Sequence, residues 1–383
     1  MESEILSSAQ SFPARAVVRF AGVGEAEANI AGVATAARIV RELALAGVRE
    51  AWLVFPETPA LCDRARADVA RLSEGMVVAL LTEAELPGRL QGLATAPAVF
   101  RGDRLISSDQ IPLAARLSEA EQSSLGSEFA GGGAASAVVE ATGKASDGIV
   151  SRWINRPISR RISTLLLRNP DIRPVHATAA TAVLAAAMFL SLLLGGRGGL
   201  IAGGLLFQAA SIVDGVDGEI ARATHRSSAA GATLDSLVDM ATNLLFVLGL
   251  TINLGHHSGH TAHTLAMLGA WDLGVMVTGL LVIAGAGRRS DSRLNFDVMK
   301  ESSKARFTEG LAARLIELGT AITSRDFFAL IFMLATIVGA APAILYLLAL
   351  VGTGWLVYVL AATLLSRSNW ESIAPNPMAS DAF

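Results

Sequence analysis

The chain has 383 residues, of which 52% are hydrophobic and 17% charged, and its formal net charge is −3. This composition, with a mean hydropathy of +0.49, is too apolar for an ordinary soluble enzyme. The single cysteine, Cys62, excludes an internal disulfide and a cysteine-based zinc site and fits a reducing compartment. Long hydrophobic runs begin only near Val175, so we expect a soluble N-terminal part followed by a membrane-embedded part.

The N-terminal part alternates strand and helix patterns. Residues 1–13 are polar, lack the apolar core of a signal peptide and are expected to form a disordered lead. Over residues 14–117 we predict strands at Ala16–Phe20, Glu50–Phe55, Met76–Leu81 and from Val99, with helices at Ala34–Ala46 and Pro59–Leu72. This alternation predicts a soluble α/β domain with a parallel sheet. Residues 118–146 are rich in Gly, Ala and Ser and are predicted to be a linker.

The segment RIVRELALAGVREAWLVF resembles the helix–strand unit that follows the nucleotide loop in sugar-nucleotidyltransferase-like domains. Such domains bind triphosphate on a Gly-rich turn with cationic side chains, because backbone N–H groups and cations neutralise phosphate. Here the turn has Gly22 and Gly24, but the first cation after them is Arg38, and Glu25 and Glu27 lie between. We therefore interpret the domain as a degenerate, inactive nucleotidyltransferase-like fold with a role in dimer packing, substrate sensing or binding.

Residues 147–173 interleave arginines with Trp and aliphatic residues in SDGIVSRWINRPISRRISTLLLRNPDIR. Amphipathic spacing of this kind predicts a juxtamembrane helix that lies at the membrane surface. Its arginines attract anionic lipid head groups in one interpretation. In the other, at least one of them also binds a substrate phosphate.

The remaining apolar runs predict an α-helical membrane domain over residues 174–367, with about six spans near the ~20 residues that cross a bilayer. The spans are expected at Val175–Leu194, Gly199–Ile220, Leu234–Leu254, Thr261–Ile283, Phe327–Ala340 and Ala343–Leu365. Basic residues gather on one side of these spans, whereas the opposite loops carry Arg197 alone. By the positive-inside rule, we expect both termini, including the polar tail 368–383, and the soluble domain in the cytoplasm.

The strongest motif reads D-x2-D-G-x2-A-R-x8-G-x3-D-x3-D and occupies residues 214–239. Its fixed positions are Asp214, Asp217, Gly218, Ala221, Arg222, Gly231, Asp235 and Asp239. Carboxylates three or four apart share one face of a helix, so two packed helices would place two pairs across one gap. Anions at membrane depth are costly without partners, and hard oxygen ligands suit Mg²⁺ or Mn²⁺. A buried acidic cluster with a structural or transport role is the alternative interpretation.

This motif resembles the signature of the CDP-alcohol phosphotransferase family without departure at any fixed position, and the resemblance covers about residues 147–367. It implies transfer of a phosphoalcohol or phosphatidyl group from a CDP-linked donor to an acceptor hydroxyl, with release of CMP. It implies two metal ions, with Asp214, Asp217, Asp235 and Asp239 as ligands and Asp239 also as the base. It further implies a homodimer and nucleotide contacts from Asp214, Gly218, Ala221, Arg222 and Gly231, where the glycines allow close approach.

Three arginines at predicted cytoplasmic span ends are candidates for an acceptor phosphate, because a guanidinium grips phosphate bidentately: Arg288, Arg289 and Arg325. Topogenic anchoring is the competing explanation for each. The histidines of GHHSGHTAH, residues 255–263, are expected on the opposite side as an ordinary polar loop. We expect His225 to be a solvated loop residue.

The order of the two parts resembles that of the bifunctional inositol-1-phosphate cytidylyltransferase/di-inositol-phosphate-phosphate synthases, and SDGIVSRWINRPISRRIS is similar to their junction. The main hypothesis is a CDP-alcohol phosphotransferase of the cytoplasmic membrane. Its donor is CDP-diacylglycerol or a CDP-inositol-like compound, its acceptor a polyol or phosphopolyol, and no nucleic-acid partner is expected. The first alternative is an active bifunctional enzyme, and the second is a non-catalytic membrane scaffold or binding protein.

Overall fold

The computed structural model describes residues 14–129, 133–144, 147–289 and 325–366, and it describes the backbone alone for 127, 282–289 and 358–366. The predicted disordered lead, 1–13, and the predicted C-terminal tail, 368–383, lie outside these residues. The chain divides into two compact units. The first comprises Met1–Ala145, Ile158–His176 and Val216–Ser228, and the second comprises Ser146–Pro157, Ala177–Gly215 and Ala229–Phe383.

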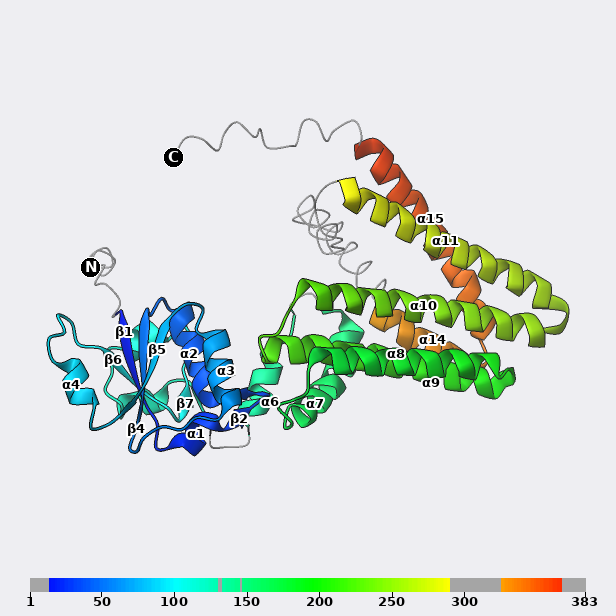
Figure 1. Cartoon of the computed structure of the whole chain (residues 1–383). Helices are drawn as coiled ribbons and strands as arrows, with labels where there is room; N and C mark the ends of the chain where they lie inside the picture. The colour runs from blue at the N-terminus through cyan, green and yellow to red at the C-terminus, as the bar shows by residue number, and fades with distance from the viewer. Residues whose placement is uncertain (1–13, 130–132, 145–146, 290–324, 367–383) are drawn as a thin grey trace. The chain divides into compact units, whose positions relative to one another are not determined.

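A four-stranded parallel sheet in the order β5-β4-β1-β6 forms the centre of the first unit (Figure 1). Its strands are β1 (Arg15–Arg19), β4 (Glu50–Phe55), β5 (Val77–Thr82) and β6 (Ala98–Arg101). These elements confirm the four predicted strands and their parallel pairing. Five of the six residues of β4 are buried, as expected for a central strand covered on both faces.

Helices cover both faces of this sheet. Val40 and Leu43 of α2 (Thr35–Leu45) and Leu72 of α3 (Asp63–Leu72) pack into one core with Leu53. Leu86 of α4 (Leu86–Leu90) packs on the other face. Just beyond α2, Gly47 adopts φ +88 while Val48 N–H donates to the Leu43 carbonyl, a left-handed helix cap that glycine accommodates without strain.

Short elements fill the rest of the first unit. Between β1 and α2 lie α1 (Val23–Glu27) and the antiparallel pair β2 (Asn29–Ile30) and β3 (Val33–Ala34). After β6 come β7 (Arg104–Leu105) and α5 (Ile111–Ala114). The stretch that we predict as a linker carries η1 (Glu121–Ser124), β8 (Ser127–Glu128), which pairs with β7, and α6 (Ala134–Glu140).

The loop after β1 turns its acidic side chains toward backbone donors. Glu25 accepts the N–H of Ala21 at 2.6 Å, and Glu27 accepts the N–H of Cys62. A phosphate-binding loop would direct backbone N–H groups at its ligand. In this chain, carboxylates of the protein itself occupy those two donors.

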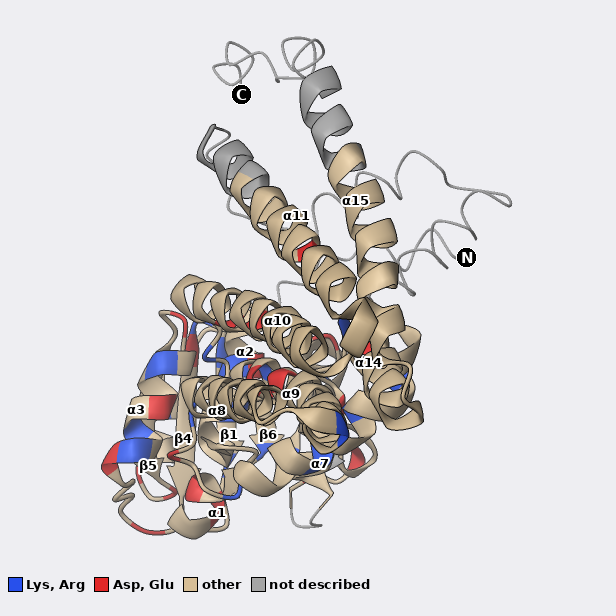
Figure 2. Cartoon of the chain, turned by 90° about the vertical axis from the view of Figure 1, so that its right-hand side faces the viewer, with Lys and Arg blue, Asp and Glu red and all other residues tan. Residues whose placement is uncertain are grey.

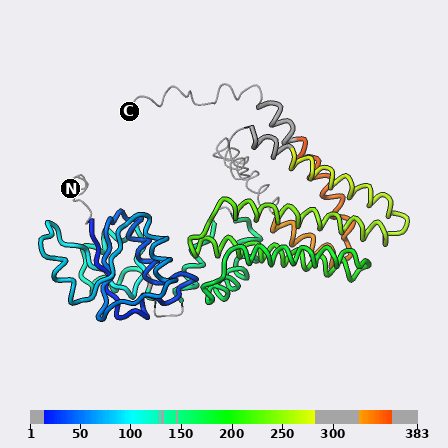
Figure 3. The backbone as a smooth tube through the Cα atoms, in the orientation of Figure 1, coloured from blue at the N-terminus to red at the C-terminus, as the bar shows by residue number. Residues whose placement is uncertain are grey.

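The C-terminal part is helical. It begins with the π-helical turn η2 (Ser151–Asn155), in which Trp153 is 75% exposed, and α7 (Arg156–Leu166). The long helices follow: α8 (Pro174–Leu193), α9 (Gly196–Ala223), α10 (Ala229–His257) and α11 (Ala262–Arg289), with the short η3 (Gly259–Thr261) before α11. After the gap come α14 (Arg325–Val338) and α15 (Ala341–Ser366). Figure 3 traces this path.

Four helical segments within the described residues are long and apolar enough to cross a membrane: Pro174–Leu193, Gly196–Ala223, Ala229–His257 and Gly259–Leu281. They confirm four of the predicted spans and an integral membrane protein. The other two predicted spans are also helical, but α14 has only 14 residues and the apolar stretch found in α15 is Ala341–Val357. The count of six therefore stays a prediction. Figure 2 shows how few charged residues the long helices carry.

An aromatic stack joins α9, α10 and α14 within the second unit. The rings of Phe207 and Phe246 lie 4.2 Å apart, and those of Phe246 and Phe332 lie 5.7 Å apart. Gly204 lets α9 and α14 approach closely, because a Cβ there would lie 2.2 Å from Oγ1 of Thr336. Small residues and stacked rings thus fix the three helices that carry the candidate site.

Candidate active site on α9, α10 and α14

The motif lies on two consecutive helices. Asp214, Asp217, Gly218, Ala221 and Arg222 belong to the C-terminal half of α9, and Gly231, Asp235 and Asp239 belong to the N-terminal half of α10. Residues 224–228 join the helices. Asp214 belongs to the same compact unit as α10, and the short connection between the helices lets it approach Asp235 and Asp239.

Three carboxylates form a cluster. Asp214, Asp235 and Asp239 each offer one carboxylate oxygen, and these oxygens all lie within 4.8 Å of one another. The sequence predicts that carboxylates from two helices lie close together, and these three do. Asp217, one turn after Asp214 on α9, is buried and does not belong to this group.

Arg325, the first residue of α14, is the cation at this cluster. It forms ion pairs with Asp214, at 3.0 Å, and with Asp239. Its Nε and Nη2 atoms are buried and have no hydrogen-bond partner among the described residues. The sequence prediction assigned Arg325 to an acceptor phosphate, and the structure places it against the carboxylates with two donors still to satisfy.

The cluster fits a divalent metal ion. Within the described part of the chain, the guanidinium of Arg325 pairs with two of these carboxylates, and Oδ1 of Asp214 is buried with no hydrogen-bond partner there. A buried carboxylate oxygen without a donor is costly, and a cation relieves that cost. Carboxylate oxygens are the ligands that Mg²⁺ and Mn²⁺ prefer.

The other predicted site residues lie on α9, α10 and α11. The guanidinium of Arg222 folds back along its own helix, so that a Cβ at Gly218 would lie 3.0 Å from its Nη1 atom, and its Nε donates to the Thr142 carbonyl at 2.8 Å. Ala221 lies in the same turn, and Gly231 is exposed in the first turn of α10. Arg288 and Arg289 end α11, and their side chains lie outside the described residues.

A buried glutamate at the site was not found from the sequence. Glu219, 1% exposed, accepts hydrogen bonds from Ser159 at 2.7 Å and Ser163 at 2.6 Å. The two serines are four apart on α7 and share one face. They fix α7 against the last turns of α9, two residues from Asp217. The signal in the sequence was the pair of serines four apart in RPISRRIS.

A polar network that the sequence did not indicate supports Arg325. Gln208 donates to Asn155 at 2.8 Å, Asn155 donates to Ser211 at 3.2 Å, and Ser211 donates to Asp326 at 2.7 Å. This chain of bonds links η2 and α9 to the first turn of α14. It holds the residue next to Arg325 and so orients the guanidinium toward the cluster.

His225 ends α9 in a Schellman motif. It has φ +53 and its own N–H donates to the Arg222 carbonyl, while Arg226 N–H donates to the Ala221 carbonyl. The expectation that His225 is solvated is wrong, because the residue is half-buried. Burial, with smaller contributions from the positive charges of Arg41, Arg38 and Arg71, lowers the pKa of His225 from 6.5 to about 3.

This shift predicts a pH dependence of stability. Between pH 6.5 and about 3 the unfolded chain binds a proton at His225 that the folded chain does not, so the free energy of unfolding falls as the pH falls through this window. His225→Asn keeps a residue that tolerates positive φ and removes the titration. We expect the fall in the thermal midpoint of the full chain between pH 7 and pH 4 to be smaller in this variant.

The exposed His260→Asn is the matched control and should keep the wild-type pH dependence. Parallel wild-type and His225→Asn curves over the whole range would contradict the assignment.

Curated relatives match parts of the chain. It is 41% identical over 114 residues to the bifunctional IPC transferase and DIPP synthase of Archaeoglobus fulgidus, a match that covers 29% of this chain and 22% of that protein. The Thermococcus kodakarensis protein of the same name is 42% identical over 93 residues, 24% of this chain and 20% of that protein. The Rubrobacter xylanophilus protein is 39% identical over 125 residues, 33% of this chain and 28% of that protein. The chain thus spans about a quarter of the length of these relatives.

The family comparison covers the helical part. Residues 173–364, half of the chain, match the family model described as CDP-alcohol phosphatidyltransferase. This range contains every position of the aspartate motif, the carboxylate cluster and Arg325. The predicted class, a CDP-alcohol phosphotransferase and hence a transferase of phosphate-containing groups, agrees with this match. The chain belongs to the CDP-alcohol phosphatidyltransferase family.

Proposed function

We propose that this membrane protein transfers a phosphoalcohol or phosphatidyl group from a CDP-linked donor to an acceptor hydroxyl and releases CMP. The observation that carries the proposal is the cluster of Asp214, Asp235 and Asp239, whose carboxylate oxygens lie within 4.8 Å of one another on α9 and α10. It lies in the region that matches the family. A scaffold has no chemical need for three carboxylates at membrane depth, which argues against a non-catalytic role.

Each predicted site residue has a separate role in this reaction. Asp214, Asp217, Asp235 and Asp239 would hold one or two Mg²⁺ or Mn²⁺ ions, which offset the charge of the donor diphosphate and make CMP a better leaving group. Asp239 accepts the proton of the acceptor hydroxyl as its oxygen bonds to the phosphorus of the transferred group, while the bond from that phosphorus to the CMP oxygen breaks. The cytidine nucleotide is contacted by Gly218, Ala221, Arg222 and Gly231.

Arg325 binds an acceptor phosphate in this proposal. Its Nε and Nη2 atoms are donors without partners among the described residues, and a phosphate can accept both. Arg288 and Arg289 at the end of α11 are further candidates. A phosphorylated polyol therefore suits the site as acceptor.

The donor is either CDP-diacylglycerol or a CDP-inositol-like compound. The names of the relatives, IPC transferase and DIPP synthase, favour the second. An active cytidylyltransferase in the N-terminal domain is the alternative function. Glu25 and Glu27 argue against it, because the loop after β1 carries these two carboxylates and Glu25 occupies the Ala21 N–H of that loop, while Glu27 accepts the N–H of Cys62 before α3.

The wider architecture belongs to the same proposal. A soluble, nucleotidyltransferase-like domain over residues 14–117 precedes a linker to residue 146, a membrane-surface helix over 147–173 and a six-span membrane domain over 174–367. The soluble domain, both termini and the site face the cytoplasm, and the protein is a homodimer. The excess of Arg and Lys at one set of span ends supports this orientation.

The test is release of CMP by the purified full chain. CDP-diacylglycerol and CDP-inositol are each offered with inositol phosphate, glycerol phosphate or inositol, in Mg²⁺ and in EDTA. We expect CMP with one donor in Mg²⁺ and none in EDTA. Release of pyrophosphate from CTP and inositol phosphate would support the bifunctional alternative instead. No CMP from any pair, by protein that binds the donors, would contradict the proposal.

A further inference from the structure

The last turn of α9 has carbonyl groups that the helix itself cannot satisfy. The Schellman motif takes up two of them, because Arg226 N–H donates to Ala221 at 2.8 Å and His225 N–H donates to Arg222 at 3.2 Å. The Ile220 carbonyl accepts the N–H and the hydroxyl of Thr224. The carbonyls that follow, of residues 223, 224 and 225, need donors from elsewhere.

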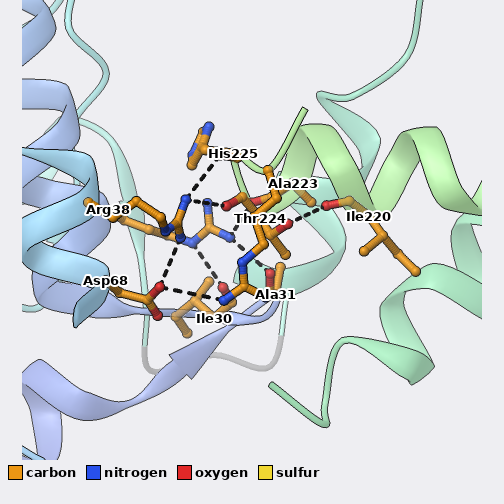
Figure 4. Close-up of polar contacts among 10 residues, drawn as sticks. Ile30, Ala31, Arg38, Asp68, Ile220, Ala223, Thr224 and His225 are labelled. Atoms are coloured by element: carbon orange, nitrogen blue, oxygen red, sulfur yellow. Dashed lines mark hydrogen bonds and ion pairs between the residues drawn. The ribbon is translucent and has the colours of Figure 1, made fainter. Parts of the chain in front are cut away.

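Two arginines of the α/β domain supply these donors (Figure 4). Nη2 of Arg38, on α2, donates to the Ala223 carbonyl at 2.8 Å. Nη1 of Arg71, on α3, donates to the Thr224 carbonyl at 3.2 Å and to the His225 carbonyl at 3.0 Å. We call this pair the arginine clamp. Two guanidinium groups also offset the partial negative charge at the C-terminus of a helix.

The arginine clamp is itself held in place. Arg38 is 4% exposed, and it also donates to the carbonyls of Ile30, at 2.9 Å, and Ala31, at 3.1 Å. Burial lowers the pKa of Arg38 to about 10, so it stays charged at neutral pH. Arg71 pairs with Asp68 at 2.8 Å, and the same carboxylate lies 3.7 Å from Arg226. Burying a guanidinium is costly unless its donors are used, and three carbonyls accept from the buried Arg38.

The loop after β1 contributes to the same contact. Nδ2 of Asn29 donates to the carbonyls of Leu167 and Arg168, both at 3.0 Å. At the tip of the β2–β3 pair, Gly32 has φ +83, and a Cβ there would lie 2.8 Å from Leu167 and 2.9 Å from Thr224. The segment in the position of a nucleotide loop is thus packed against the end of α7 and the residues after α9.

From these contacts we infer that Arg38 and Arg71 are positioning residues of the transferase, and that the α/β domain orients the motif turn of α9 for the nucleotide donor. The inference rests on the proposed function. Arg222 directly precedes Ala223, and its own carbonyl is part of the Schellman motif, so the arginine clamp fixes its backbone. Thr142 holds the Arg222 side chain. The turn that carries Arg222 and Gly218 is therefore ordered by a domain outside the membrane helices.

Steady-state kinetics of the full chain test the inference. Arg71→Met removes the two hydrogen bonds to the Thr224 and His225 carbonyls, together with the ion pair to Asp68, from a side chain that is 33% exposed. Arg38→Lys keeps the charge but not the guanidinium fork. We expect Arg71→Met to raise the KM for the CDP donor about tenfold or more, and Arg38→Lys to raise it less, while kcat stays within about twofold. Arg66→Met, an exposed arginine on the same helix α3, should leave both constants unchanged.

Hydrogen exchange gives a readout that needs no turnover. We expect the amides of residues 224–228 to exchange faster in Arg71→Met and Arg38→Lys than in the wild type and in Arg66→Met, and the dissociation constant of CMP to rise in parallel. A donor KM within twofold of the wild type in both variants, or unchanged exchange, would overturn the inference. If the wild type releases no CMP, the proposed function is wrong. Hydrogen exchange of residues 224–228 and the dissociation constant of CMP then still test whether the arginine clamp orders the turn.

Discussion

Asp239→Asn is expected to lower the rate of CMP release by about a thousandfold or more, because it removes a proton acceptor and a charged metal ligand together. The amide keeps the size of the side chain and one carbonyl oxygen. It lacks the charge that draws a divalent cation and the basicity that takes up the hydroxyl proton. Asp239 is one of the three clustered carboxylates and an ion-pair partner of Arg325. The substitution therefore affects metal binding and proton transfer together. The measurement is Mg²⁺-dependent CMP release at saturating donor and acceptor.

Asp109→Asn is the matched control, since Asp109 is an exposed aspartate of the α/β domain, and it should keep full activity. Binding of Mg²⁺ raises the thermal midpoint in proportion to the logarithm of its concentration, so the same two variants can be compared for metal affinity. We expect this rise to be smaller in Asp239→Asn. Activity above about a tenth of the wild type in Asp239→Asn would contradict its role as the base.

Arg325→Met is expected to raise the KM for a phosphorylated acceptor about ten- to a hundredfold, since a hydrogen bond to a charged group contributes about 1.5–3 kcal/mol. It should also destabilise the protein in EDTA, because the carboxylates of Asp214 and Asp239 lose their cation. Mg²⁺ should reduce this second effect, since the ion supplies positive charge to the same cluster. The measurements are acceptor kinetics, and thermal unfolding with and without Mg²⁺.

Arg325→Lys separates the two roles of this side chain. Lysine keeps the charge but lacks the planar fork, so it should restore stability in EDTA and still raise the acceptor KM. Arg197→Met, at an exposed arginine in the first turn of α9, should match the wild type in both measurements. If both Arg325 variants bind the acceptor as the wild type does, Arg325 is only a counter-ion of the aspartates.

Local patterns in the sequence were sufficient to predict the individual strands and helices. The apolar run Glu50–Phe55 gave the bounds of β4 without error, and Gly47 marked the end of α2. These features depend on the residues of one segment and their neighbours, as does the length of an apolar helix. The spacing of the aspartates likewise predicted that carboxylates of two helices meet, and three of them do.

Contacts between distant segments were decided only by the tertiary structure. Arg325 lies 86 positions after Asp239, and the sequence could place it at a span end but not at the carboxylates. The serines that bind Glu219 lie 56 and 60 positions before it, and Arg38 lies 185 positions before the carbonyl it caps. No periodicity within a segment reports on such pairs.

His225 illustrates the same limit. A histidine beside an arginine in a loop resembles a solvated residue, because its neighbours in the chain are polar. Its backbone carbonyl accepts a hydrogen bond from Arg71, and the charges of Arg38 and Arg71 contribute to its lowered pKa, although both arginines are far away in sequence. The sequence by itself determined the strands, the membrane helices and the family motif, since each follows from local pattern and spacing. The tertiary structure decided which buried charges and carbonyls are paired, because each pair is made by groups from segments that only the fold brings together.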